Sequence, residues 1–274
     1  MPTVTRLDQI TPGMRVIYYD GDEEIGPGVL PVGLKDLGLG NSFTRRIGIG
    51  VLPDGLDRLT LKNQPIEAGL LPPCLKSLSY IGNEPIATGV LPRGLESLTL
   101  IGFNRPIELG VLPAGLEYLS FEGDAFTHPI RVGVLPAGLM ALGLGDGFNS
   151  PIEPGALPAG LINAHFRGFN QPISPGVLPT GLQNLWLAGF NRPIEAGVLP
   201  TGLKNLVLQG FNQQIELDVL PEGLEELTFM GDGYTAQFLS GVFPKSLKMF
   251  QLFNKTHPQY KLLKGTGWKK FQRL

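Results

Sequence analysis

The sequence predicts a mainly β solenoid of about eleven turns, each 19–23 residues long, with short parallel strands and almost no α-helix. Three observations support this fold class: a block GVLPxGLxxLxL recurs, its proline returns at nearly constant spacing, and 38 glycines and 25 prolines are spread over 274 residues. Such a period indicates stacked supersecondary units rather than separate globular domains. The prolines that mark the copies are Pro31, Pro53, Pro72, Pro92, Pro113, Pro136, Pro158, Pro179, Pro200, Pro221 and Pro244.

Composition and charge exclude several classes of protein. Hydrophobic residues make up 42% of the chain, which is the apolar content of a folded protein, and the formal net charge of −2 argues against nucleic acid as a partner. The first residues lack the apolar run of a signal peptide, so we expect none. No run of roughly 18 apolar residues is free of glycine, proline or charge, so we expect no membrane span.

The first element is expected to be an N-terminal cap with a degenerate first turn, at residues 1–27. Val16-Ile17-Tyr18 aligns with the strand position of the repeat, although the GVLP block is missing there. The ends of a solenoid need caps because the last turn would otherwise expose its core. The repeat itself is expected at residues 28–254.

Each repeat is expected to contribute one strand of three or four residues, since glycine and proline bracket it. Leucines two positions apart share one face of a strand, so Leu98 with Leu100, and Leu185 with Leu187, are expected to point inward. Stacking of the turns then brings equivalent strands side by side in a parallel sheet.

The turn after each strand carries a polar residue, mostly asparagine, and an aromatic residue. A buried asparagine side chain can satisfy backbone groups of its turn and bond to the next turn, so we expect a structural ladder. The aromatic residues are expected to fill the core beneath the turn. The expected ladder comprises Asn63, Asn83, Asn104, Asn149, Asn170, Asn191 and Asn212. The aromatic row comprises Phe43, Phe103, Phe126, Phe148, Phe169, Phe190, Phe211, Tyr234 and Phe253.

The return segment of each turn, PIxxGVLPxGL, holds too much glycine and proline for an α-helix. We expect an extended path with turns, including a 3₁₀ turn. A glycine stands three residues before many of the marker prolines, as at Gly50, Gly110 and Gly176. Glycine at a repeated turn position predicts a positive φ or tight stacking there.

The last element is expected to be a basic C-terminal cap at residues 255–274, with a hairpin or an extra strand. From residue 233 onward the chain holds eight lysines and arginines and no acid, whereas the remainder holds 14 basic and 24 acidic residues. Such a patch is either a solubilising cap or a docking surface for an acidic partner, including another copy of the chain. The basic patch comprises Lys261, Lys264, Lys269, Lys270 and Arg273.

Three five-residue segments carry a resemblance to a known family: Phe103-Asn104-Arg105-Pro106-Ile107, Phe169-Asn170-Gln171-Pro172-Ile173 and Phe190-Asn191-Arg192-Pro193-Ile194. With the leucine pattern, they resemble the leucine-rich repeat superfamily and, within it, the FNIP repeat family, from about Ile25 to Asn254. The resemblance implies a ligand-binding scaffold without intrinsic catalysis. Because such proteins are known from social amoebae and their giant viruses, it also implies a cytoplasmic or virion location.

The outward residues of the strands are the expected binding surface, because solenoids of this kind bind through their sheet face. Exposed aromatic and arginine side chains are favoured anchors at protein interfaces. The candidate binding residues are therefore Tyr118, Asn163, His165, Arg167, Asn184 and Trp186.

The sequence offers no catalytic or metal constellation, and we expect no enzyme activity, no cofactor and no metal. The three histidines, His128, His165 and His257, fall on different turns, so they form neither a triad nor a metal cluster. Glycine-rich runs such as residues 143–147 are not followed by a helix, so they lack the dipole of a phosphate-binding loop.

Three functions remain open from the sequence. The leading one is recognition of a partner protein through the sheet face. The first alternative is a structural part of a larger assembly, such as a viral particle. The second alternative is binding to a polysaccharide or ice surface, suggested by the hydroxyl row Thr60, Ser79, Thr99 and Ser120.

Overall fold

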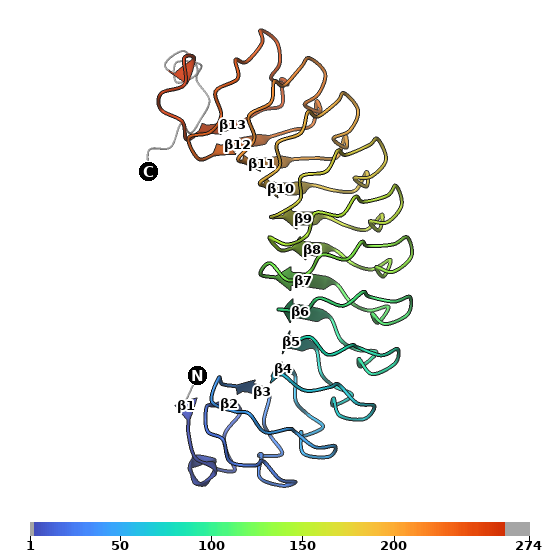
Figure 1. Ribbon diagram of the computed structural model, residues 1–274, viewed down its shortest axis with the longest axis vertical. Helices are drawn as coiled ribbons and strands as arrows, with labels where there is room; N and C mark the ends of the chain where they lie inside the picture. The colour runs from blue at the N-terminus through green and yellow to red at the C-terminus, as the bar shows by residue number, and fades with distance from the viewer. Residues whose placement is uncertain (1–2, 261–274) are drawn as a thin grey trace. The chain divides into compact units, whose positions relative to one another are not determined.

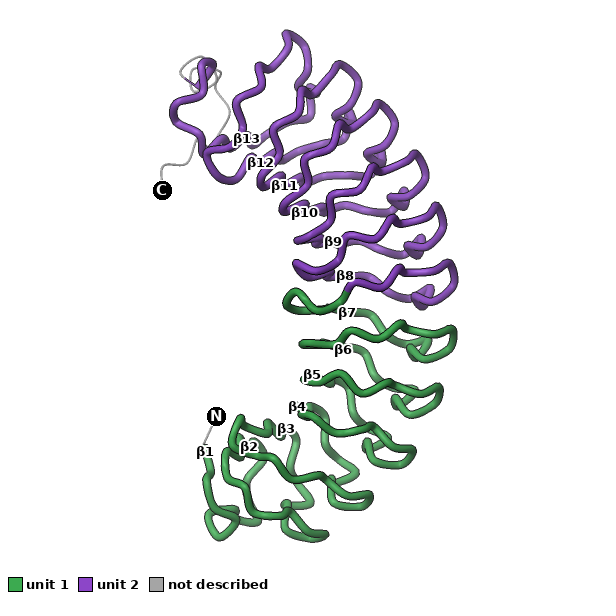
Figure 2. Tube along the Cα trace, in the orientation of Figure 1, with its two compact units in different colours: residues 1–126 green, residues 127–274 purple. Residues whose placement is uncertain are grey.

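The computed structural model describes residues 3–260 and divides the chain into two compact units, residues 1–126 and residues 127–274 (Figure 2). Each unit is a parallel β solenoid in which strands that follow one another in the chain pair side by side (Figure 1). The first unit holds five of the marker prolines and the second holds six. The predicted fold class, a mainly β solenoid of about eleven turns, is thereby confirmed.

The strands of the first unit succeed one another at one per turn. They are β1 (Thr3–Val4), β2 (Val16–Tyr19), β3 (Asp36–Leu39), β4 (Arg58–Lys62), β5 (Ser77–Ile81), β6 (Ser97–Ile101) and β7 (Tyr118–Glu122). A single 3₁₀ turn, η1 (Leu7–Gln9), lies between β1 and β2. The short strand β1 pairs with β2, so the degenerate first turn has a strand on its outer edge.

The strands of the second unit are stacked in the same way. They are β8 (Ala141–Leu144), β9 (Asn163–Phe166), β10 (Asn184–Ala188), β11 (Asn205–Gln209), β12 (Glu226–Met230) and β13 (Met249–Leu252). Several strands have five residues rather than the three or four expected. The reason is that the residue after the second leucine also pairs, as Ala188 does with Gln209.

The alternation of buried and half-buried residues along each strand shows on which face of the sheet the core lies. In β10, Leu185 and Leu187 are buried, whereas Trp186 between them lies half-buried on the opposite face. Successive side chains of a strand point to opposite faces, so this pattern fixes which face is covered by the return segments. The aromatic row is buried as expected, except that Phe253 is only half-buried.

Two consecutive β-turns replace the 3₁₀ turn that was expected in the return segment. In one turn, the N–H of Val198 donates to the C=O of Glu195 at 3.2 Å, and the N–H of Leu203 then donates to the C=O of Pro200 at 3.0 Å. The first of these turns has Gly197 at its third position with a φ of 80°, as a type II turn requires. The second bond recurs after every marker proline.

The predicted positive φ three residues before the marker proline is confirmed. All eleven turns have it, ten with glycine and one with Asp218, whose φ is 64°. A β-carbon disfavours this region, which explains why glycine dominates the position.

The asparagine row differs from the expectation in its burial. Its members are exposed or half-buried rather than buried, because they lie at the rim of the turn. The bonds join a side chain to the backbone of the next turn. Asn170 Oδ1 accepts from the N–H of Asn191 at 2.9 Å, and Asn191 Oδ1 accepts from the N–H of Asn212 at 2.9 Å. Bonds of the same kind join Asn83 to Asn104 and Asn149 to Asn170.

Asn63 departs from this row, since it has a φ of 45° and its N–H donates to the C=O of Ile81 at 2.8 Å. The expected basic patch, Lys261, Lys264, Lys269, Lys270 and Arg273, lies outside the described residues. Among residues 3–260, no helix is long and apolar enough to cross a membrane.

Candidate functional site

Four of the six candidate binding residues lie on neighbouring strands of the second unit, and a fifth directly follows one of these strands. Asn163 and His165 are on β9, Arg167 directly follows it, and Asn184 and Trp186 are on β10. The parallel register pairs Asn184 with Asn163 and Trp186 with His165, so each type of side chain lies beside its equivalent on the next strand. This register turns a spacing of 21 residues in the sequence into direct contact.

His165 and Trp186 stack face to face on the outward side of the sheet. Their ring centroids are 4.2 Å apart, and the planes differ by 14°. The residue paired with His165 on its other side is Gly143 on β8, which has no side chain. The two stacked rings, called the aromatic ledge below, therefore lie beside a strand position that has no side chain.

A line of asparagine amides runs beside the ledge and holds it in register. Asn184 Nδ2 donates to Asn163 Oδ1 at 2.7 Å, and Asn205 Nδ2 donates to Asn184 Oδ1 at 2.5 Å. Asn205 on β11 was not among the predicted site residues. Its position 21 residues after Asn184 was the available signal.

The surroundings of the ledge disfavour the charged form of the His165 imidazole. Burial lowers the pKa of His165 below its ordinary value, the positive charge of Arg167 lowers that pKa further, and Asp146 opposes the change. A neutral imidazole beside an indole loses less hydration than a charged one would. The indole Nε1 of Trp186 is buried and has no hydrogen-bond partner within residues 3–260.

The sixth candidate, Tyr118, belongs to the first unit. It begins β7, and 40% of its surface is exposed. The hydroxyl row of the same unit is less uniform than the sequence suggests, because Ser120 is only 7% exposed while Thr60, Ser79 and Thr99 are half-buried.

The histidines do not converge in the described part of the chain. His257 is buried, and its Nε2 lies 2.9 Å from the C=O of Ala236, a contact that supports the last described turn. Within residues 3–260, no group of three or more His, Cys, Asp or Glu residues could hold a metal ion.

Comparison with one solved structure places the fold among leucine-rich repeat proteins. A structure described as CroV588, a novel circular LRR protein, superposes with a TM-score of 0.57 and 26% identity over 85% of this chain and 49% of that one. The chain thus spans about half the length of that protein. YopM from Yersinia enterocolitica WA-314 is matched with a TM-score of 0.38 and 19% identity over 87% of this chain and 73% of that one.

No curated protein matches the sequence significantly. The family model described as FNIP Repeat matches residues 22–62, 103–147, 148–188, 190–232 and 211–255. These segments cover more than half of the chain and include β3, β4 and the strands from β7 to β13, so the chain belongs to the FNIP repeat family.

Proposed function

We propose that the protein is a non-catalytic scaffold that binds a partner protein through the sheet face of its second unit. The observation that carries this proposal is the stack of His165 and Trp186, which presents flat aromatic surface from two paired strands. Large, rigid aromatic side chains supply contact area at little cost in conformational entropy. Repeat solenoids commonly bind through such extended faces.

The neighbours of the ledge support the same role. The amide line from Asn163 to Asn205 immobilises polar side chains before a partner arrives, which reduces the entropy lost on binding. Arg167 is exposed at the end of β9, where its guanidinium can reach a carboxylate or a backbone carbonyl of the partner. Together these groups offer apolar area at the centre and hydrogen-bonding groups at the rim.

The test is affinity capture of the tagged full chain from its native cells or virus, followed by quantitative mass spectrometry. The double variant Trp186→Ala with Arg167→Ala is expected to lose a partner that the unmodified chain retains, with affinity at least about tenfold lower. The matched control is Arg131→Ala with Val132→Ala, which removes one arginine and one apolar side chain, both exposed, from a return segment of the same unit.

Recovery of the same partner by both variants would refute the sheet-face proposal. Near-stoichiometric recovery of assembly proteins, unaffected by the Trp186 change, would instead support the structural alternative. A purified chain that adheres to a polysaccharide or to ice, and loses this with Thr60→Ala and Thr99→Ala, would support the second alternative.

A further inference from the structure

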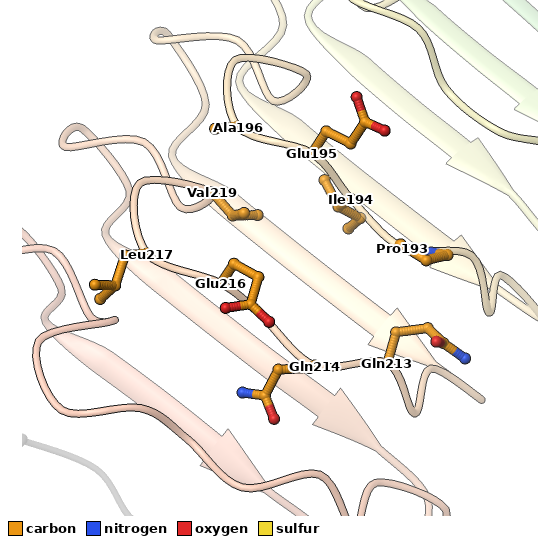
Figure 3. Close-up of a pocket in the computed structure, with 9 residues that line it drawn as sticks. All are labelled: Pro193, Ile194, Glu195, Ala196, Gln213, Gln214, Glu216, Leu217 and Val219. Atoms are coloured by element: carbon orange, nitrogen blue, oxygen red, sulfur yellow. The ribbon is translucent and has the colours of Figure 1, made fainter.

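The second unit carries a groove on its return segments, away from the residues of the sheet-face site. The groove lies between residues 193–196 of one turn and residues 213–219 of the next, and its volume is about 380 Å³ (Figure 3). Ile194 and Val219 line it and are buried, whereas Leu217 at its border is 52% exposed. A single exposed leucine needs no explanation, but this one adjoins an apolar recess that is open to solvent.

The border of the groove is acidic. Glu195 and Glu216 occupy corresponding positions of the two turns, and both line the groove (Figure 3). Asp218 follows two residues later, and all three residues are exposed. None of the three carboxylates forms an ion pair with another of the described residues. The lining residues include no lysine or arginine.

We propose that this groove binds residues 261–274 of the same chain. That segment reads KLLKGTGWKKFQRL and therefore combines five basic residues with leucines, a tryptophan and a phenylalanine. Its apolar side chains suit the recess between Ile194 and Val219, and its cations suit the unpaired carboxylates at the border. The match in both charge and hydrophobicity is what selects this occupant.

The residues just before this segment lie on the same side of the second unit as the groove. Gln259 Oε1 accepts from the N–H of Phe238 at 2.7 Å, and Gln259 Nε2 donates to the C=O of Phe238 at 3.0 Å. Phe238 occupies the same position of its turn as Ile194 does two turns earlier. Gln259 lies one turn beyond Phe238, so three turns, or about 15 Å along the solenoid, separate it from Ile194. An extended 14-residue segment can span up to roughly 45 Å, so the groove is within its reach.

Tethering favours binding within one chain over binding between copies. A short flexible link gives its two ends an effective concentration of the order of millimolar. Weak contacts that would not hold a free peptide therefore suffice to hold the attached segment. This inference does not depend on the sheet-face site, since the two involve different surfaces.

Tryptophan fluorescence of the full chain tests the inference. The chain has two tryptophans, so Trp186→Phe leaves Trp268 as the sole reporter on the segment. Emission is expected at a shorter wavelength than that of a synthetic peptide of residues 261–274, at every protein concentration. Glu195→Lys with Glu216→Lys, made in that background, is expected to move the emission to the value of the free peptide.

The matched control is Glu67→Lys with Glu108→Lys, which changes the charge equally at the same position of two turns in the first unit. It is expected to leave the emission unchanged, and circular dichroism checks that both variants stay folded. Peptide-like emission in the parent, or an equal response to the two charge reversals, would overturn the inference. A shift that disappears on dilution would place the segment on a second copy and would also overturn it.

Discussion

At the scale of single residues, the sheet face combines one aromatic ledge with a line of amides. His165 is the residue on which the two meet, since it stacks on Trp186 and lies on the same strand as Asn163. Its half-buried ring disfavours the charged form, and Arg167 adds repulsion to it. Burial and the charge of Arg167 thus both favour the neutral imidazole.

We predict that His165 titrates below the ordinary histidine pKa of about 6.5. Because the folded pKa is depressed, the unfolded chain binds more protons as the pH falls through 6.5, and His165 then lowers the free energy of unfolding. The loss levels off below the folded pKa. Proton NMR of the three imidazoles measures the pKa, with His165→Gln assigning the signal. A midpoint at or above 6.5 would contradict the prediction.

At the scale of elements, the positive φ of one residue, rather than side-chain packing, determines which residue occupies the third position of the first return turn. Ten of the eleven turns have glycine at the position with positive φ, and at Gly197 a β-carbon would meet no atom within 4 Å. Space is therefore available there, and only the dihedral angle selects glycine. Asp218 shows that a short polar residue tolerates the same angle.

Gly197→Ala is predicted to lower the free energy of unfolding by about 1–2 kcal/mol, because alanine resists the left-handed region. Gly33→Ala is the matched control, since this exposed glycine also has open space but no positive φ. The control is expected to be neutral or stabilising by up to about 1 kcal/mol. Urea denaturation measures both, and equal effects would show that the dihedral angle is not the cause.

Each asparagine of the row at the rim of the turns is expected to contribute less to the free energy of unfolding than a glycine of the return turns does. Asn191→Ala removes the acceptor for the N–H of Asn212 and for Gln213 Nε2, bonds of 2.9 and 3.0 Å. We predict a loss of about 0.5–1.5 kcal/mol and faster hydrogen exchange at the amide of residue 212. Asn191→Asp keeps an acceptor and is expected to retain the protection. Unchanged exchange in the alanine variant would contradict this account.

At the scale of the molecule, each unit is held by contacts between neighbouring turns. In the second unit, Phe148, Phe169, Phe190, Phe211 and Tyr234 form a column with successive ring centroids 6.2–6.3 Å apart. Stability of such a solenoid is close to a sum of terms for turns and for interfaces between them. A substitution in the column is therefore expected to destabilise mainly the turns on either side of it.

Phe190→Ala is predicted to cost about 3–5 kcal/mol, because the ring is fully buried between Phe169 and Phe211. Phe190→Leu keeps most of the volume and loses mainly the two ring contacts, so about 1–3 kcal/mol is expected. Hydrogen exchange should rise most in β9, β10 and β11. A uniform rise over the second unit would show that its turns open together.

The repeat made most of the fold predictable. The eleven prolines, the paired leucines and the glycines before the prolines each recur at one position of the turn, so a local inference at one copy was tested by ten others. The strand length and the burial of the asparagines were harder to predict from the sequence. Pairing at the strand end and exposure at the rim both depend on the neighbouring turn.

The solenoid, the inward leucines and the positive φ of the return turns could be predicted from the residues alone, because each follows from local backbone and hydrophobic constraints. The stacking of His165 on Trp186 and the hydrogen bond that extends the line of amides to Asn205 depend on how the folded turns pack against one another. The same packing brings Glu195 and Glu216 to the border of one groove. These contacts join residues about 21 positions apart, and such proximity arises only when one turn stacks on the next.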